Sequence, residues 1–459
     1  MKKKFLVLLC LILCLLIVLP GCSAGKADGQ TPNNASTEKN NKQQTDSKSA
    51  DTPAVNNEPV TLKIAWWGAE GRAEKTNKVI ELFKKKFPHV TIETDYADFK
   101  TYFEKMTAYS LSGQLPDVMQ QDYAYIGQYS TSGLLEDLTP FISSKTINTS
   151  DINEATISSG TIDGKVFGIA LGVNCHNVIY DPEAFKKANV KLPSNSWTWD
   201  EYKTTISELF KNGGYQSTVP YQDDPKILVE YWARSAGKSL YNADGTSLGF
   251  DDPKLLENLF SEIQTLVKTS SVYDPVLAAT LKDQTGKSPL AEGKAFCHYS
   301  WSNLAVSEAI SANKDFELVA LPKVPSGDNA GMYLKPSMFF SITKTAAQKE
   351  TAAKFIDFFI NDTEANNILA ADRGIPVSSK IRAEVSKTLD GVAKKTMEYI
   401  DSVSGLVSPI DPPEPKGADS VRKLISEVYN ELLAEKLTPA DAANKVFAGS
   451  NEILAKNKK

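Results

Sequence analysis

Histidine and cysteine are scarce in this sequence, and their scarcity excludes several classes of site. The 459 residues include 3 histidines and 5 cysteines. His89, His176 and His298 lack the spacing of a metal site, so we expect no metal and no other cofactor. Cys175 and Cys297 lie far apart and outside any compact cysteine framework. We therefore expect two separate buried thiols, although an oxidising compartment would allow them to pair.

Long apolar runs are confined to the N-terminus. Phe5–Leu19 is unbroken for about 15 residues, which is too short for a stable membrane-spanning helix of about 20 residues. Lys2, Lys3 and Lys4 precede this run, as in the signal of a secreted protein. We interpret residues 1–21 as a signal peptide, and no later segment is apolar enough to span a membrane.

The apolar run ends in Leu19-Pro20-Gly21-Cys22, which resembles the bacterial lipobox. The resemblance implies that Cys22 carries the lipid of a protein anchored at the extracytoplasmic face of the bacterial cell membrane. We interpret residues 22–58 as a flexible tether, because Ser23–Pro59 contains no aromatic residue and no Leu, Ile or Met. Such a segment cannot bury enough apolar surface to offset the entropy lost on folding.

Long runs of basic residues are also missing, and the formal net charge is −5, so no nucleic-acid partner is expected. The roughly 400 residues after the tether suffice for two hydrophobic cores. Their pattern begins as strand, helix, strand, helix, strand, over residues 60–67, 73–87, 90–94, 102–112 and 117–121. This alternation predicts an α/β fold with a mainly parallel sheet flanked by helices. A hairpin is expected over Thr161–Ile169 and two helices at the C-terminus, about 421–436 and 439–456.

A series of short motifs resembles the extracellular solute-binding family that includes maltose-binding protein. In order they are Trp66-Trp67-Gly68, Phe83–Val90, Gly113–Val118, Ser132–Leu138, Gly164–Gly168, Trp197-Thr198-Trp199, Gly293–Trp301, Lys335-Pro336-Ser337 and Arg373–Pro376. None of them is specific alone, but their order and spacing are characteristic. They cover nearly all of residues 60–456.

The resemblance implies two α/β lobes of the type II periplasmic-binding-protein fold, joined by crossing strands that form a hinge below a cleft. We expect residues 59–172 and 325–373 in the N-terminal lobe and residues 173–324 and 374–459 in the C-terminal lobe. The resemblance further implies that the lobes close on ligand by hinge bending. The resemblance also implies a monomer that hands a sugar to the membrane permease of an ABC importer, which a cytoplasmic ATPase drives.

Within that family, four stretches resemble receptors for pectin-derived oligosaccharides of the rhamnogalacturonan type. They are Ile64–Gly68 with Arg72 behind it, Leu171–Asn174, Leu334–Met338 and Asp411–Pro415. The narrower resemblance implies an acidic sugar, which needs a cation aimed at its carboxylate. Arginine suits this role because its fork meets both carboxylate oxygens, and Arg72 and Arg373 are the candidates.

Aromatic and amide side chains are the expected sugar ligands, because sugar C–H faces stack on rings and hydroxyls bond to planar polar groups. Trp301 and Trp199 are aromatic candidates. Trp66 and Trp67 adjoin at one strand end, so one is expected to face the core and the other, by preference Trp67, the cleft. Three polar candidates complete the set: Gln121 and Asp122 follow the third strand, where open α/β sheets bind ligands, and Asn174 lies in a crossing strand.

Catalytic motifs are not convincing in this sequence. Gly245–Gly249 spells the nucleophile-elbow pattern, but Asp244-Gly245 is expected to be a hairpin turn rather than the strand-turn-helix that the elbow needs. We therefore expect a binding protein and not an enzyme. Two alternatives stay open: a receptor for a peptide, polyamine or iron, and a surface polysaccharide lyase or glycosidase.

Overall fold

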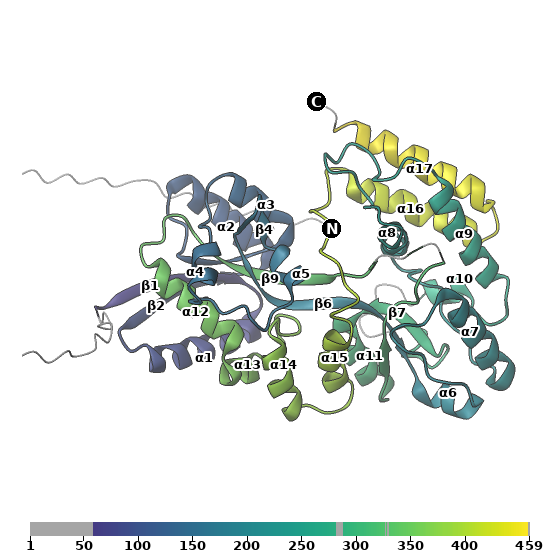
Figure 1. The fold of residues 1–459 in the computed structure, drawn as a ribbon, viewed down its shortest axis with the longest axis horizontal. Coiled ribbons are helices and arrows are strands. Elements are labelled where there is room, and N and C mark those ends of the chain that lie inside the picture. The colour runs from purple at the N-terminus through teal and green to yellow at the C-terminus, as the bar shows by residue number, and fades with distance from the viewer. Residues whose placement is uncertain (1–57, 281–287, 326, 328–329, 458–459) are drawn as a thin grey trace, which may run out of the picture. The chain divides into compact units, whose positions relative to one another are not determined.

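The fold begins with the predicted alternation of strands and helices (Figure 1). The computed structural model describes residues 58–280, 288–325, 327 and 330–457, which belong to one unit spanning Asn57–Lys459. The first elements are β1 (Val60–Trp67), α1 (Glu70–Lys86), β2 (Val90–Ala97), α2 (Phe99–Ser112) and β3 (Val118–Gln121). Strand β1 pairs in parallel with both β2 and β3, as the alternation predicts. The signal peptide, Cys22 and nearly all of the tether lie outside the described residues.

Local sequence explains where the early helices begin and end. The Asp98 side chain accepts hydrogen bonds from the backbone of Lys100 and Thr101 at the start of α2. Gly113 ends the helix in the left-handed conformation with φ 69°, which glycine adopts without steric cost. Helix α7 (Trp199–Gly213) begins with a capping box, in which the Thr198 side chain accepts from the Glu201 backbone and the Glu201 side chain accepts from the Thr198 backbone.

The remaining strands turn the sheet into a mixed one. They are β6 (Ile169–Tyr180), β7 (Cys297–Trp301), β8 (Glu317–Val319) and β9 (Leu334–Ile342), and the strand order is β2-β1-β3-β9-β6-β7 with β8 paired to β6. The pairs β3–β9, β6–β9, β6–β7 and β6–β8 are all antiparallel. The α/β class is confirmed, with its parallel part in β2-β1-β3. The predicted hairpin forms β4 (Thr161–Ile162) and β5 (Lys165–Val166).

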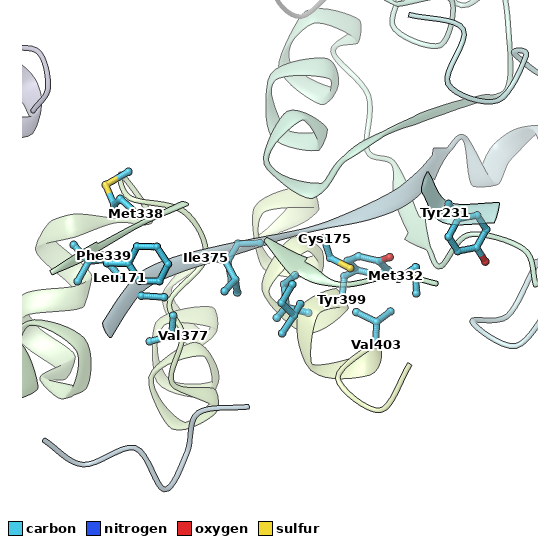
Figure 2. Packing of buried hydrophobic residues seen from close by; sticks show 14 of the residues in the cluster. Leu171, Cys175, Tyr231, Met332, Met338, Phe339, Ile375, Val377, Tyr399 and Val403 are labelled. Carbon is cyan, nitrogen blue, oxygen red and sulfur yellow. The ribbon is translucent and has the colours of Figure 1, made fainter. Parts of the chain in front are cut away.

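Strand β6 connects two regions of the sheet. Its first part, from Ile169 to Cys175, pairs with β9, and its last part, from His176 to Tyr180, pairs with β7. Buried apolar side chains follow β6 along its length, as Figure 2 shows for Leu171 and Cys175 with their neighbours from other elements. Strand β6 therefore joins the part of the sheet that contains β9 to the part that contains β7.

Helices cover the sheet and form most of the second half of the chain. They are α3 (Tyr123–Thr131), α4 (Thr139–Ser143), α5 (Glu154–Ser158), α6 (Pro182–Ala188), α7 (Trp199–Gly213), α8 (Pro225–Ser235), α9 (Lys254–Val267), α10 (Pro275–Ala279), η1 (Ser302–Leu304), α11 (Ala305–Ala312), α12 (Lys349–Asn361), α13 (Thr363–Leu369), α14 (Ser379–Val385), η2 (Ser386–Thr388), α15 (Gly391–Ser402), α16 (Ala418–Leu433) and α17 (Pro439–Ala455). The two predicted C-terminal helices are α16 and α17. No helix among the described residues is long and apolar enough to cross a bilayer.

The two cysteines of the fold are separate thiols, as predicted. Cys175 and Cys297 are both free and buried. Burial raises the pKa of the Cys175 thiol to about 12 and that of the Cys297 thiol to about 11. Since the thiolate is the reactive form, both side chains are chemically inert in the folded protein.

Candidate functional site

A cavity that we call the main cavity lies where strand ends from several parts of the sheet meet. Its volume is about 600 Å³. Asp122 follows β3, Asn174 lies in β6, Trp301 ends β7 and Lys335 is the second residue of β9, and all four line the cavity. The other lining residues are Tyr123, Ala124, Glu230, Leu240, Tyr241, Asn303, Tyr333, Pro336, Ser337, Ile410, Asp411, Pro412, Pro413, Glu414 and Arg422.

Trp301 provides a fixed aromatic surface in this cavity. Its ring centroid lies 3.6 Å from that of His176, with a tilt of 35°, and 6.0 Å from that of Tyr333. His176 is buried and its Nδ1 lies 2.8 Å from the hydroxyl of Tyr221. Burial, reinforced by nearby lysine and arginine charges, holds the pKa of His176 well below its usual range, so this ring is neutral. The neutral imidazole of His176 thus packs against the indole of Trp301 and helps to fix its position.

Most of the charged side chains around the cavity form ion pairs with one another. Lys226 Nζ lies 2.6 Å from the carboxylates of both Glu230 and Glu414. Arg422 bridges Glu414, at 3.1 Å, and Asp224, at 2.5 Å. These five side chains form one ion-pair network along a wall of the cavity. A second pair joins the Arg234 guanidinium to Asp411.

Lys335 is the exception among the basic side chains of the cavity. It is exposed, and no carboxylate of the described residues lies within salt-bridge distance of it. Its Nζ lies over the ring of Trp301, 5.1 Å from the centroid, which is a cation–π contact. Lys335 also lies directly opposite Asn174 in the β6–β9 ladder. Among the described residues that line the cavity, Lys335 is therefore the cation available to an anionic group.

Three of the residues predicted from the sequence lie together in this cavity: Asp122, Asn174 and Trp301. The Asp122 carboxylate caps α3, accepting a hydrogen bond from the Ala124 backbone at 2.9 Å. The Oδ1 atom of Asn174 is buried and has no hydrogen-bond partner among the described residues. That these residues bind ligand stays a prediction.

Trp66 and Trp67 do not reach the cavity, which corrects the expectation that one of them faces it. Trp66 is fully buried and stacks on Tyr96, with centroids 5.6 Å apart. Trp67 packs against Phe99 and Phe103 at 5.3 and 5.5 Å. Helix α2 thus covers the ring that was expected to be open.

Neither predicted arginine lines the cavity. Arg72 Nε lies 2.8 Å from the Asp372 carboxylate, and Arg72 also donates to the carbonyls of Trp67 and Asp372. Arg373 is buried and donates to Gln120 and Thr76. Burial, together with the neighbouring charge of Arg72, lowers the pKa of Arg373 to about 9. Both side chains join distant segments of the fold.

Gln121 and Trp199 are likewise core residues. Gln121 is fully buried in β3, whose two faces are both covered. Trp199 packs edge-on against Trp232, with centroids 5.2 Å apart, and its Nε1 donates to Glu262 at 2.9 Å. The position of Trp199 at the first turn of α7 directs its ring into the helical layer.

Several lining residues were not singled out from the sequence. They are Tyr123, Glu230, Tyr241, Tyr333, Lys335 and Arg422. A signal for some of them was present, since two of the pectin-type stretches, Leu334–Met338 and Asp411–Pro415, contribute residues to the cavity wall. The bond of Arg422 to Asp224 had no local signal, because the two residues lie 198 positions apart, whereas Glu230 pairs with Lys226 one turn earlier on α8.

Known proteins share both the sequence and the fold of this chain. A maltodextrin-binding protein of Bacillus subtilis is 23% identical over 340 residues, which cover 72% of this chain and 78% of that protein. An arabinooligosaccharide-binding protein of the same organism is 23% identical over 244 residues, covering 52% and 49% of the two chains.

Solved structures extend the likeness to most of the chain. A family 1 extracellular solute-binding protein of Alicyclobacillus acidocaldarius is 30% identical with a TM-score of 0.81, covering 87% of this chain and 99% of that one. An oligogalacturonide-binding protein of Yersinia enterocolitica has the same fold at 19% identity, with a TM-score of 0.71 and coverage of 86% and 99%. Residues 78–394 match the model of the family described as bacterial extracellular solute-binding protein. The chain therefore belongs to the bacterial extracellular solute-binding proteins.

Proposed function

We propose that this protein is the receptor of an ABC importer for an oligosaccharide that contains acidic rings. The main cavity combines a half-buried indole with amide and carboxylate groups, which is the chemistry that holds sugar rings and hydroxyls. Relatives named for maltodextrin, arabinooligosaccharide and oligogalacturonide binding support a sugar. Cys22 would carry the lipid that keeps the receptor beside its permease outside the cytoplasm.

The proposal includes two lobes that close on the ligand. Residues 59–172 with 325–373 would form one lobe, and residues 173–324 with 374–459 the other. The cavity wall draws on both sets, with Asp122 and Lys335 from the first and Trp301 and Arg422 from the second. The Tyr123 hydroxyl already donates to the Asp411 carbonyl from one set to the other at 2.5 Å.

Lys335 is the observation that favours an acidic ligand. Lys335 is exposed and lines the cavity, and its ammonium lies over the Trp301 ring. A sugar that stacks on this ring displaces the ammonium and loses a cation–π contact of about 0.5–1 kcal/mol. A carboxylate on that sugar can bond to the Lys335 ammonium instead. This bond more than offsets the lost cation–π contact, because hydrogen bonds to charged groups contribute about 1.5–3 kcal/mol. The residue therefore selects acidic over neutral rings.

Calorimetry with tetragalacturonate and its carboxyl-reduced, neutral counterpart tests this proposal. Lys335→Met should weaken tetragalacturonate binding about tenfold or more, since one charge-assisted bond is lost. The same variant should bind the neutral sugar as well as or better than the wild type, because the ammonium no longer competes for the ring. Lys187→Met, an exposed position on α6, controls for the change in net charge.

Two outcomes would count against it. Equal losses for both sugars would give Lys335 a structural role only. If the wild type binds neutral maltotetraose more tightly than tetragalacturonate, the ligand is not acidic. That result would still be consistent with a sugar receptor.

A further inference from the structure

A second cavity adjoins the main cavity at Asn174 and Asn303, which line both spaces. Its volume is about 280 Å³. Its wall is built from the start of α11, the segment that follows α13, the end of α14 and the first turns of α15. We refer to this space as the apolar cavity. Because the two cavities share these residues, one ligand is able to occupy both.

Apolar residues form most of the wall of the apolar cavity. They are Val306, Ile375, Val385, Leu389, Ala393 and Met397. None of the described residues that line this cavity is charged. The hydroxyl of Thr396, which also lines it, already donates to the Val392 carbonyl at 2.7 Å. The hydroxyls of a sugar ring would lose their bonds to water here without gaining enough partners, so the wall favours an apolar group.

The size of the apolar cavity limits the kind of apolar group. A cavity of about 150 Å³ lined by leucine, isoleucine and phenylalanine holds one benzene molecule. The apolar cavity is larger than this, so it accommodates an aromatic ring together with its substituents or its linking atoms. A methyl or acetyl group would leave most of the wall without contacts, and lost contacts mean lost dispersion attraction. An aromatic group is therefore the occupant that fits both the chemistry and the volume.

One part of the wall has a strained backbone. Ala370 and Ala371 line the apolar cavity, and their φ angles are 48° and 56°. Residues with a Cβ atom adopt this left-handed region at a steric cost, and two of them in succession are unusual. Ala370 ends α13 at a position where glycine is the common residue. Such strain is found preferentially at ligand sites, where the surrounding structure maintains it.

We propose that the apolar cavity binds an aromatic substituent of the sugar whose rings occupy the main cavity. The substituent would be an aryl group joined to the sugar through an ester or ether oxygen near Asn174 and Asn303, where the two cavities meet. The assignment to a sugar ligand rests on the proposed function. The aromatic site itself depends only on the apolar cavity.

Filling the apolar cavity tests the proposal with an identical substitution as the control. Ala393 is half-buried and lines the cavity, so Ala393→Phe fills it. Ala383, on α14, is exposed and does not line the cavity, so Ala383→Phe leaves it open. Leu389→Asn makes the wall polar at a half-buried position and covers the case in which Ala393→Phe fails to fold.

Two kinds of probe separate the aromatic site from the sugar site. Benzyl alcohol is an aromatic ring without a sugar, and saturation-transfer NMR should show it bound to the wild type and to Ala383→Phe, and not to Ala393→Phe. Leu389→Asn should weaken this binding. By calorimetry, the wild type should bind the phenyl glycoside of digalacturonate about tenfold or more tightly than the methyl glycoside, as burial of one ring predicts. Ala393→Phe should lose this preference and keep its affinity for the methyl glycoside.

Several results would contradict the proposal. Absence of transfer to the wild type, or equal transfer to the wild type and to folded Ala393→Phe, would overturn the aromatic site. If Ala393→Phe does not fold, equal transfer to the wild type and Leu389→Asn would do the same. Equal affinities of the wild type for the phenyl and methyl glycosides would show that the aromatic group is not part of the sugar ligand. If benzyl alcohol binds in the cavity and neither glycoside binds, the aromatic site is supported and the acidic-sugar proposal is wrong.

Discussion

At the scale of single residues, His298 shows how buried carboxylates change the titration of an imidazole. Burial alone would lower the pKa of His298, but Glu308 and Asp223 outweigh it and raise the pKa to about 9. A histidine in an unfolded chain titrates near 6.5. The folded state therefore binds the proton more tightly. Its contribution to stability is fully present below about pH 6.5 and is lost as the pH rises through about 9.

Glu308→Gln should remove this pH dependence. The variant keeps an acceptor for Ser288 and loses the charge that holds the proton. We expect its free energy of unfolding to fall by up to about 3 kcal/mol near pH 6, with a much smaller difference near pH 10. Urea denaturation at the two pH values measures it, and His89→Gln is the control histidine. A loss of equal size at both pH values would show that the ion pair does not set the stability of this region.

Single residues of the site were predictable where a strand end fixes them. Asp122 and Asn174 were found because they follow or lie within recognisable strands, and Trp301 because it ends a motif. Arg72 and Trp199 look equally suited to ligand binding in the sequence. In the structure, Arg72 pairs with Asp372 and Trp199 donates a hydrogen bond to Glu262, and both acids lie far away in the chain. Such pairings are tertiary, and neither periodicity nor spacing reveals them.

At the scale of elements, β6 depends on a close backbone approach at Gly172. The register of its pairing with β9 shifts on both sides of this glycine. A Cβ atom built on Gly172 would lie 2.1 Å from the Arg373 carbonyl oxygen. The next residue, Val173, exchanges hydrogen bonds with Ile375 at 2.8 and 3.2 Å. The segment 373–375 thus crosses β6 where only glycine fits.

Gly172→Ala should therefore destabilise the protein by about 1–3 kcal/mol, the usual cost of forcing extra atoms into a packed site. It should also weaken ligand binding, because Asn174 and Lys335 face each other two residues further along the ladder. Gly71→Ala is the matched control. Nothing lies within 4 Å of its Cβ position in α1, so it should be neutral or stabilising by up to about 1 kcal/mol. Denaturant unfolding compares the two; equal stability of Gly172→Ala and wild type would refute the close approach.

Elements themselves were the most predictable level. The alternating strands, the helices that end at Gly113 or before Pro88, and the Asp163-Gly164 hairpin all follow from local patterns. The antiparallel placement of β9 between β3 and β6 did not, since its partners lie more than a hundred residues earlier in the chain. Local periodicity defines a strand and its faces, but long-range packing chooses its neighbours.

At the scale of the whole molecule, membership of the solute-binding family confirms a binding protein rather than an enzyme. The proposed closure follows from the cavity itself. A ligand that contacts both walls stabilises only the form in which both walls reach it, so binding shifts the population toward that form. A change in the distance between the two proposed lobes when ligand binds would therefore test both the division into lobes and their closure.

Spin labels at two exposed positions can report this closure. Leu111 is 87% exposed on α2, which packs on β1 and β2, and Lys423 is 79% exposed on α16, which packs on α8, α9 and α17. Leu111→Cys and Lys423→Cys, in a Cys22→Ser background, label selectively because Cys175 and Cys297 are buried. Pulsed electron spin resonance should show a shorter distance between the labels when ligand is added.

A second labelled pair distinguishes lobe closure from local rearrangement. Leu111→Cys with Lys354→Cys, on α12, places both labels within the proposed N-terminal lobe, so their distance should not change on binding. Lys335→Met should still close on a neutral sugar that it binds, because closure requires contact with both walls and not the charge. If calorimetry shows ligand bound and the Leu111–Lys423 distance is unchanged, the receptor binds without hinge bending, and the permease must recognise the ligand-bound state by some feature other than closure.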